Sequence, residues 1–94
     1  MALYTIVCTF RKQQYVHQVE EEAVVPALRK WARDLDCSAI PDFGPLSKTR
    51  LNKELAELAF LGPDECKGLV NTWTWGSLVS NFDFLVVIVQ TEPV

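Results

Sequence analysis

The sequence has few of the residues that usually carry out chemistry. It contains a single histidine, His17, and its three cysteines, Cys8, Cys37 and Cys66, form no C-x-x-C pair. An odd number of widely spaced cysteines predicts neither a disulfide framework nor a zinc knuckle. The four glycines are scattered, so there is no phosphate-cradling loop, and no G-x-S-x-G elbow occurs. We therefore expect a protein without enzymatic activity, bound metal or cofactor.

Positive charge is also scarce. Nine Lys and Arg against twelve Asp and Glu give a formal net charge of −3. Nucleic acids and anionic membrane surfaces both favour clustered Lys and Arg, so we expect neither as a partner. A basic partner protein is compatible with this charge, although solubility alone would also select it.

Long apolar runs are missing as well. The longest run is far too short to span a membrane, and residues 1–12 show no charged leader and no small-residue cleavage pattern. A cytoplasmic location is therefore expected. The chain has 94 residues, of which 49% are hydrophobic and 22% charged. These values predict one globular domain over residues 1–94.

The most informative segment present is residues 84–89, which read FLVVIV near the C-terminus. Four of these six residues are β-branched, which favours a strand buried on both sides over a short helix. Such a strand is expected at the centre of a sheet, because an exposed edge this apolar would recruit other chains. Its side chains form two sets on opposite faces: Phe84, Val86 and Ile88, and Leu85, Val87 and Val89.

Periodicity predicts four strands and two helices. Alternation predicts strands over residues 3–10, 15–19, 70–79 and 84–91, and an apolar stripe predicts a helix over residues 23–35. The second helix is expected to begin with Ser47 as its N-cap and to stop before Gly62-Pro63. Its predicted buried stripe consists of Leu51, Leu55, Leu58 and Ala59. The order ββααββ predicts an α+β fold, a four-stranded antiparallel sheet packed with two helices.

Three local features refine this arrangement. The segment 11–14 contains no glycine, which predicts a hairpin loop longer than a tight primed turn. The strand over residues 15–19 is short and flanked by polar residues, which suits a sheet edge. Gly76 is a candidate position for a bulge in the strand over residues 70–79.

One face of the sheet is predicted to need further cover. If both helices lie on one face, half of the apolar segment 84–89 stays bare, and apolar patches of more than a few hundred Å² are rarely left so. Either the helices divide between the faces, or a second copy packs sheet against sheet, and we favour the homodimer. The predicted interface consists of Trp73, Trp75, Leu85, Val87 and Val89.

Several reactive or binding groups are possible, but each has a simpler structural explanation. Cys8 and His17 can face each other across the first hairpin and so activate a thiolate, yet alternation places Cys8 on the apolar face. The acidic run 20–22 is expected to be a solvated start of a helix, and the acids at 64–65 a turn, rather than metal ligands. Trp73 and Trp75 can stack bases, but they lack the basic flanks of nucleic-acid-binding sheets.

The first third of the chain contains Tyr4-Thr5-Ile6-Val7, then residues 15–19, YVHQV, then a helix with Ala27-Leu28 and Trp31. This pattern resembles the opening of HicB-type antitoxins, in which a Y-T-V-V-like strand, a Y-V-like strand and an E-A-L helix follow one another. The resemblance covers roughly the first 35 residues. That family usually continues into a DNA-binding segment, whereas this chain has a Trp-rich hairpin near its C-terminus, so DNA binding is not implied. It implies a small, acidic, dimeric protein that holds a partner, and it assigns no residue a role.

The sequence therefore predicts a small non-enzymatic protein-binding module that self-associates through its sheet. Two alternatives stay open. One is an immunity or antitoxin-type protein that neutralises a basic toxin. The other is a small-ligand-binding domain with its pocket between the second helix and the sheet.

Overall fold

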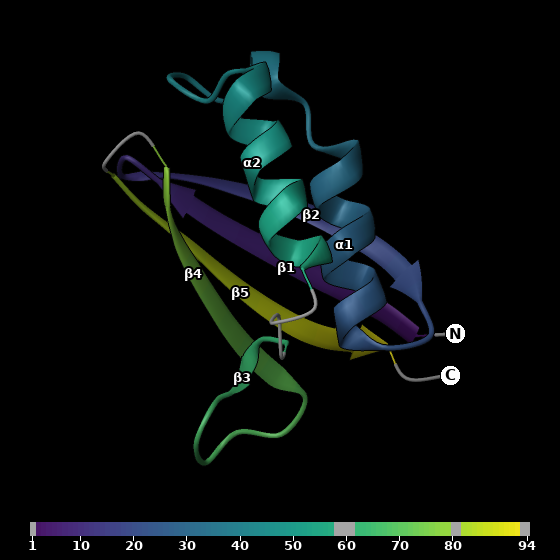
Figure 1. Cartoon of the computed structure of the whole chain (residues 1–94). Coiled ribbons are helices and arrows are strands. Elements are labelled where there is room, and N and C mark those ends of the chain that lie inside the picture. The colour runs from purple at the N-terminus through teal and green to yellow at the C-terminus, as the bar shows by residue number, and fades with distance from the viewer. Residues whose placement is uncertain (1, 58–61, 80–81, 93–94) are drawn as a thin grey trace.

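The computed structural model describes residues 2–57, 62–79 and 82–92, and it shows two helices packed on one face of a sheet (Figure 1). The elements are β1 Ala2–Phe10, β2 Gln13–Glu21, α1 Val24–Asp34, the 3-10 helix η1 Cys37–Ala39, α2 Pro45–Ala56, β3 Asp64–Glu65, β4 Thr72–Val79 and β5 Phe82–Glu92. The strand order is β2-β1-β5-β4-β3, and every neighbouring pair is antiparallel. The predicted α+β class is confirmed.

The sheet has five strands, whereas four were predicted. The additional strand is β3, whose Asp64 and Glu65 pair with Thr74 and Trp73 of β4. The backbone N–H of Cys66 then donates to the carbonyl of Thr72 at 2.8 Å. Two acidic residues contain no apolar alternation, so the sequence indicated only a polar connection here.

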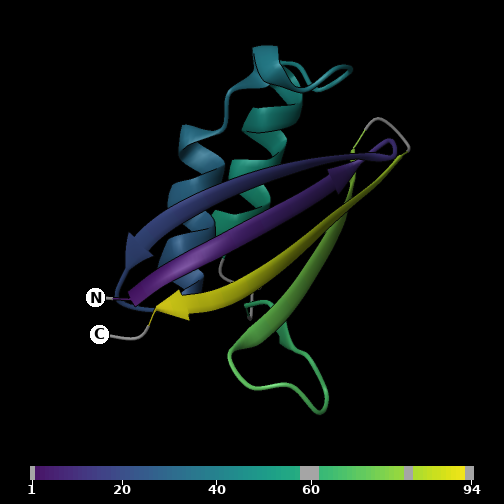
Figure 2. The same cartoon turned by 180° about the vertical axis from the view of Figure 1, so that it is seen from behind.

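The apolar segment 84–89 lies in β5, and β5 is a central strand as predicted. It pairs with β1 on one side and with β4 on the other. Phe84, Val86 and Ile88 are buried beneath the helices. The opposite side of the sheet faces away from both helices, and Figure 2 shows it without any element of the chain in front of it.

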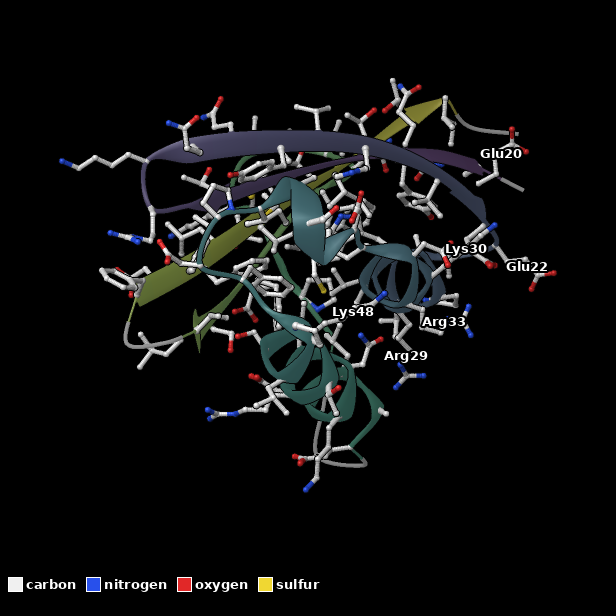
Figure 3. All side chains as sticks on the ribbon, turned by 90° about the horizontal axis from the view of Figure 1, so that it is seen from above. Glu20, Glu22, Arg29, Lys30, Arg33 and Lys48 are labelled. Carbon is white, nitrogen blue, oxygen red and sulfur yellow. The ribbon has the colours of Figure 1, made fainter. Side chains whose placement is uncertain are left out.

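The two helices cover the sheet with apolar faces and are tied to each other by polar side chains. Ala27, Leu28, Trp31 and Ala32 of α1 are buried. The Arg29 Nε–H donates to the carbonyl of Leu55 at 2.9 Å, and the Asn52 side-chain amide donates to the carbonyl of Ala32 at 2.9 Å. Arg29 and Arg33 extend from α1 away from the sheet (Figure 3).

The second helix begins earlier than predicted. Its N-cap is Gly44 and Pro45 occupies the first helical position, so Ser47 is not the cap. Proline suits that position because its missing N–H has no intrahelical acceptor to lose. Leu51 and Leu55 are buried as expected. The helix ends at Ala56, and the other predicted members of its stripe, Leu58 and Ala59, lie outside the described residues.

The turn between β1 and β2 is tighter than predicted. Phe10 pairs directly with Gln13, which leaves only Arg11 and Lys12 in the turn, with φ of 51° and 67°. Two-residue turns with positive φ match the twist of the strands that they join. Arg11 is also held by an ion pair with Asp42 and lies 4.4 Å above the ring of Phe82. These contacts hold Arg11 in the turn, where each left-handed non-glycine residue costs about 1–2 kcal/mol.

The predicted bulge at Gly76 is wrong. The register between β4 and β5 runs without a shift from Thr72 opposite Val89 to Val79 opposite Phe82. The irregularity lies instead between Leu3 and Tyr4, in the pairing of β1 with β5. β2 is an edge strand as predicted, although it spans nine residues rather than five.

An aromatic cluster fills the core between the sheet and the helices. The ring of Phe84 lies 5.6 Å from Phe10, 6.1 Å from Trp31 and 5.4 Å from Phe43, measured between ring centroids. These four residues come from β5, β1, α1 and the segment that precedes α2. The cluster therefore joins every layer of the domain.

Candidate functional site

The five residues of the predicted interface lie on two different sides of the sheet. Trp73 pairs with Ile88 and Trp75 with Val86, which places both tryptophans on the side covered by the helices. The ring of Trp73 lies 6.1 Å from that of the buried Tyr4. Leu85, Val87 and Val89 lie on the uncovered side.

We call the uncovered side the open face, and three rows of cross-strand neighbours form its centre. Each row crosses β2, β1, β5 and β4 in that order. The rows are Gln14–Thr9–Leu85–Gly76, Val16–Val7–Val87–Thr74 and Gln18–Thr5–Val89–Thr72. None of these twelve residues carries a charge. The centre of the open face is therefore an uncharged surface that continues across four strands.

Large apolar side chains on this surface are accessible to solvent. Val16 is 60% exposed, Leu85 53% and Val87 37%, and Leu78, at the end of β4, is 66% exposed. The prediction missed Val7, Val16 and Leu78. Alternation along β1 and β2 gives the signal for the first two, because Val7 lies between Thr5 and Thr9 and Val16 between Gln14 and Gln18.

The polar side chains of the open face are partly satisfied by one another. The Gln18 amide donates to the Thr5 hydroxyl at 3.2 Å, and the hydroxyls of Thr5 and Thr91 are hydrogen-bonded to each other. The Thr72 hydroxyl donates to the carbonyl of Val70 at 3.3 Å. Covering a hydroxyl that already has a partner costs less free energy than covering one without. The open face can therefore be buried at a small polar cost.

The candidate Cys–His pair does not form. Cys8 lies opposite Tyr15, whereas His17 lies opposite Ile6. Cys8 is completely buried, and burial raises the pKa of its thiol to about 12. A thiol with such a pKa holds almost no thiolate at neutral pH, which does not suit a nucleophile.

The three cysteines of the folded protein are expected to react with an alkylating reagent at different rates. Cys37 and Cys66 are half-buried, and iodoacetamide at pH 8 should modify them first. The pKa of the Cys8 thiol is about 12 rather than 9.0, which lowers its thiolate fraction about a thousandfold. Peptide mass spectrometry after timed quenching measures the three rates. In guanidinium chloride the rates should converge, and a Cys8 rate equal to that of Cys37 in the folded protein would contradict the burial.

Neither a metal-ligand cluster nor a membrane-spanning helix occurs among the described residues. Residues 2–57, 62–79 and 82–92 contain no group of three His, Cys, Asp or Glu side chains placed to hold a metal ion. Among the same residues, neither helix has the length and apolar content needed to span a bilayer.

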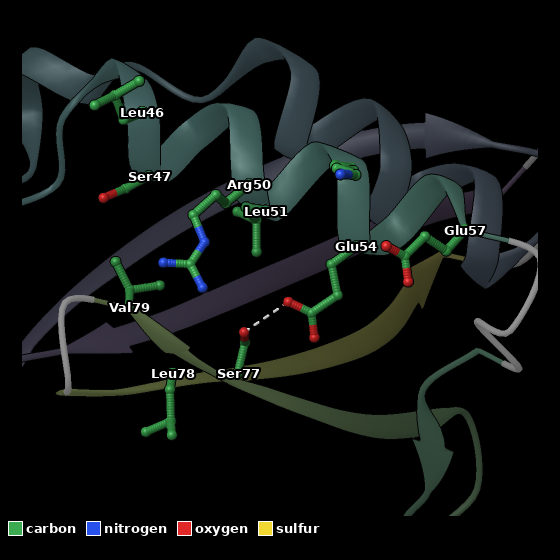
Figure 4. A pocket seen from close by; sticks show the side chains of 10 residues that line it. Leu46, Ser47, Arg50, Leu51, Glu54, Glu57, Ser77, Leu78 and Val79 are labelled. Atoms are coloured by element: carbon green, nitrogen blue, oxygen red, sulfur yellow. Dashed lines mark hydrogen bonds between the residues drawn. The ribbon is translucent and has the colours of Figure 1, made fainter.

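A groove lies between α2 and β4, where the small-ligand alternative placed its pocket. It encloses about 530 Å³, and its lining includes the buried Leu51 and Val79 together with the exposed Arg50 and Glu54. The Ser77 hydroxyl donates to the Glu54 carboxylate at 2.8 Å across the groove (Figure 4). The groove opens on the helix side of the sheet and meets the open face at Leu78, which belongs to both surfaces.

No protein family model, curated protein or solved structure matches this chain. The class that the geometry defines is an α+β domain with one sheet face uncovered and a groove on the other side. The function therefore has to be inferred from these two surfaces.

Proposed function

We propose that this chain is a small non-enzymatic protein-binding module that forms a homodimer through the open face of its sheet. The supporting observation is the set of three uncharged rows, with Val16, Leu85 and Val87 exposed across adjacent strands. Half of the twelve residues are Gln or Thr, and the apolar ones adjoin one another along β5 and across the middle row. Exposed apolar residues grouped in this way on a small domain typically mark an interaction site.

The open face is large enough for a specific contact. β4 has eight residues and is paired in a sheet with the longer strands β1, β2 and β5. With strands about 4.8 Å apart and a rise of about 3.4 Å per residue, four such strands present a face of roughly 500 Å². Two copies in contact then bury roughly 1,000 Å², which is the lower limit for a specific protein interface.

The charges nearest the open face lie at its margins. Glu20 lies opposite Leu3, Asp83 opposite Leu78 and Asp64 opposite Thr74, all at the margins of the open face. A polar rim around an uncharged centre is the usual anatomy of a protein interface. Two sheets can stack in this way with their strands aligned within about 30° or crossed at about 90°.

Light scattering after gel filtration tests the proposal directly. The chain has a mass of 10.7 kDa, so a dimer is expected at twice that mass. The dimer should persist as salt is raised, because contact between uncharged surfaces is not screened. A mass of one chain at high micromolar concentration would exclude self-association.

The immunity or antitoxin-type role is a narrower form of the same proposal. It requires the dimer to hold a further protein through a surface other than the open face. The groove between α2 and β4 is such a surface.

A further inference from the structure

The outer edge of β4 is only partly paired. β3 covers Trp73 and Thr74, and the carbonyl of Thr72 accepts from Cys66 on that side. In an antiparallel strand, alternate residues direct their backbone groups to opposite sides. The N–H and C=O groups of Gly76 and Leu78 therefore point outward like those of Thr72. No described strand pairs with this part of β4.

Helix α2 runs beside this unpaired edge, and the groove lies between them. Ser77 and Val79 point from β4 toward α2, while Arg50 and Glu54 point from α2 toward β4 (Figure 4). Leu51 and Val79 provide buried apolar surface along the groove. The groove therefore combines outward backbone groups, which no strand of the described residues pairs, with a side-chain pocket next to them.

The charges along the groove differ from one end to the other. Arg50 lies near Val79, whereas Glu57 lies at the opposite end with Glu54 between them (Figure 4). An ion pair joins Arg11 to Asp42, and among residues 2–57, 62–79 and 82–92 no carboxylate forms an ion pair with Arg50. An occupant with an acidic group at the Arg50 end and a basic group at the Glu57 end would complement the groove.

We propose that the groove binds an extended peptide segment of a partner protein, which adds a strand to β4 alongside Gly76 and Leu78. Main-chain hydrogen bonds to these two residues provide affinity, and alternate side chains enter the groove. One apolar side chain packs on Leu51 and Val79. A basic side chain faces the Glu54–Glu57 end, and a carboxylate faces Arg50.

An extended peptide fits these observations better than a compact ligand. Strand addition pairs the outward backbone groups of Gly76 and Leu78, which a compact ligand in the side-chain pocket leaves unpaired. From Trp75 to Val79 the edge spans roughly 17 Å at about 3.4 Å per residue, which matches a short peptide. Gly76 has no side chain on the exposed side of the strand, so a second backbone can approach closely.

A displayed library of random dodecapeptides, selected on the purified full chain, provides the probe. Enriched peptides should alternate apolar and polar residues and carry Lys or Arg at one end of the motif and Asp, Glu or the terminal carboxylate at the other. Peptides without this pattern, or no enrichment over a selection on Gly76→Pro, would overturn the proposal.

The Gly76→Pro variant removes the outward N–H while leaving the ladder with β5 intact, since edge positions tolerate proline. It should raise the dissociation constant of a selected peptide about tenfold, as expected for one lost backbone hydrogen bond. Circular dichroism verifies that the variant folds. If it does not fold, Glu54→Lys replaces it, with the exposed Glu22→Lys, outside the groove lining, as matched control. Only Glu54→Lys should weaken binding, and equal affinities for the two variants would contradict the assignment.

Amide hydrogen exchange tests the binding mode residue by residue. A bound strand should slow exchange of the Gly76 and Leu78 amides, whereas the Trp75 and Ser77 amides, which face β5, should change little. Unchanged exchange at Gly76 and Leu78, or a small molecule retained in native mass spectrometry that displaces the peptide, would overturn strand addition.

This inference rests on the proposed function only in treating the chain as a protein-binding module. Most of the groove lining lies on the helix side of the sheet, and Leu78 is shared with the open face. The two tests measure different quantities, oligomeric mass and peptide affinity, so their failures are distinguishable. If the chain is a monomer that binds the selected peptides, only the dimer proposal is refuted. If it is a dimer that selects no peptide, only the groove proposal is refuted.

Discussion

Replacing Phe84 by alanine is expected to lower the free energy of unfolding by about 3–5 kcal/mol, the usual range for a buried phenylalanine. Phe84 is 0% exposed, and its ring contacts those of Phe10, Trp31 and Phe43. Truncation leaves a cavity where β1, β5 and α1 meet, and these rigid elements can close it only in part. Urea denaturation followed by tryptophan fluorescence measures the loss.

Phe82→Ala is the matched control, because it makes the same truncation two residues earlier on the same strand. Phe82 is 42% exposed, and its ring contacts Phe10 at 6.3 Å. Its replacement should cost about 1 kcal/mol, as is typical outside a core. Both variants must be compared at one protein concentration, since self-association adds to apparent stability. Equal losses would show that the aromatic cluster is not the centre of the core.

The sequence predicted the centre of the fold because that part depends on composition. The run 84–89 is β-branched and apolar on both faces, so a central strand was predicted because it leaves no exposed apolar edge. The central position is confirmed, but burial on both sides is not, since Leu85 and Val87 are 53% and 37% exposed in the single chain. The stripe of α1 was equally clear, with Ala27, Leu28 and Trp31 at helical spacing. The helix prediction rests on periodicity and the strand prediction on composition, and neither depends on a single contact.

The errors occur where a few tertiary contacts outweigh local preference. Arg11 adopts positive φ in a tight turn, where its contacts with Asp42 and Phe82 hold it, and no local sequence rule reports those partners. β3 forms because its backbone pairs with the edge of β4, and its own two acidic residues show no strand pattern. Local propensity is a weak guide to segments this short.

The candidate sites depended on register, which a single sequence does not contain. Alternation correctly placed Leu85, Val87 and Val89 together, and Trp73 together with Trp75. It did not show that the tryptophans pair with Ile88 and Val86 and so lie under the helices. Predicting the lining of the groove requires the position of α2 relative to the outer edge of β4, in addition to the strand register.

Val87→Lys is expected to convert the proposed dimer into a monomer. Val87 lies in the middle row of the open face, between Val7 and Thr74, and is 37% exposed in the single chain. In the monomer the lysine reaches solvent, so the fold should be retained. In a two-fold dimer the change places two ammonium groups in an uncharged interface, and each unpaired buried charge costs several kcal/mol. The dissociation constant should rise about a thousandfold or more.

The control is the same substitution on an apolar residue outside the open face. Val70 is 81% exposed and precedes β4, so Val70→Lys should leave the dimer intact. Light scattering over a concentration series measures both variants, and circular dichroism confirms that each is folded. A dimer that survives Val87→Lys, or that Val70→Lys disrupts equally, would place the contact elsewhere, because no packing of one open face on another can leave its middle row in solvent.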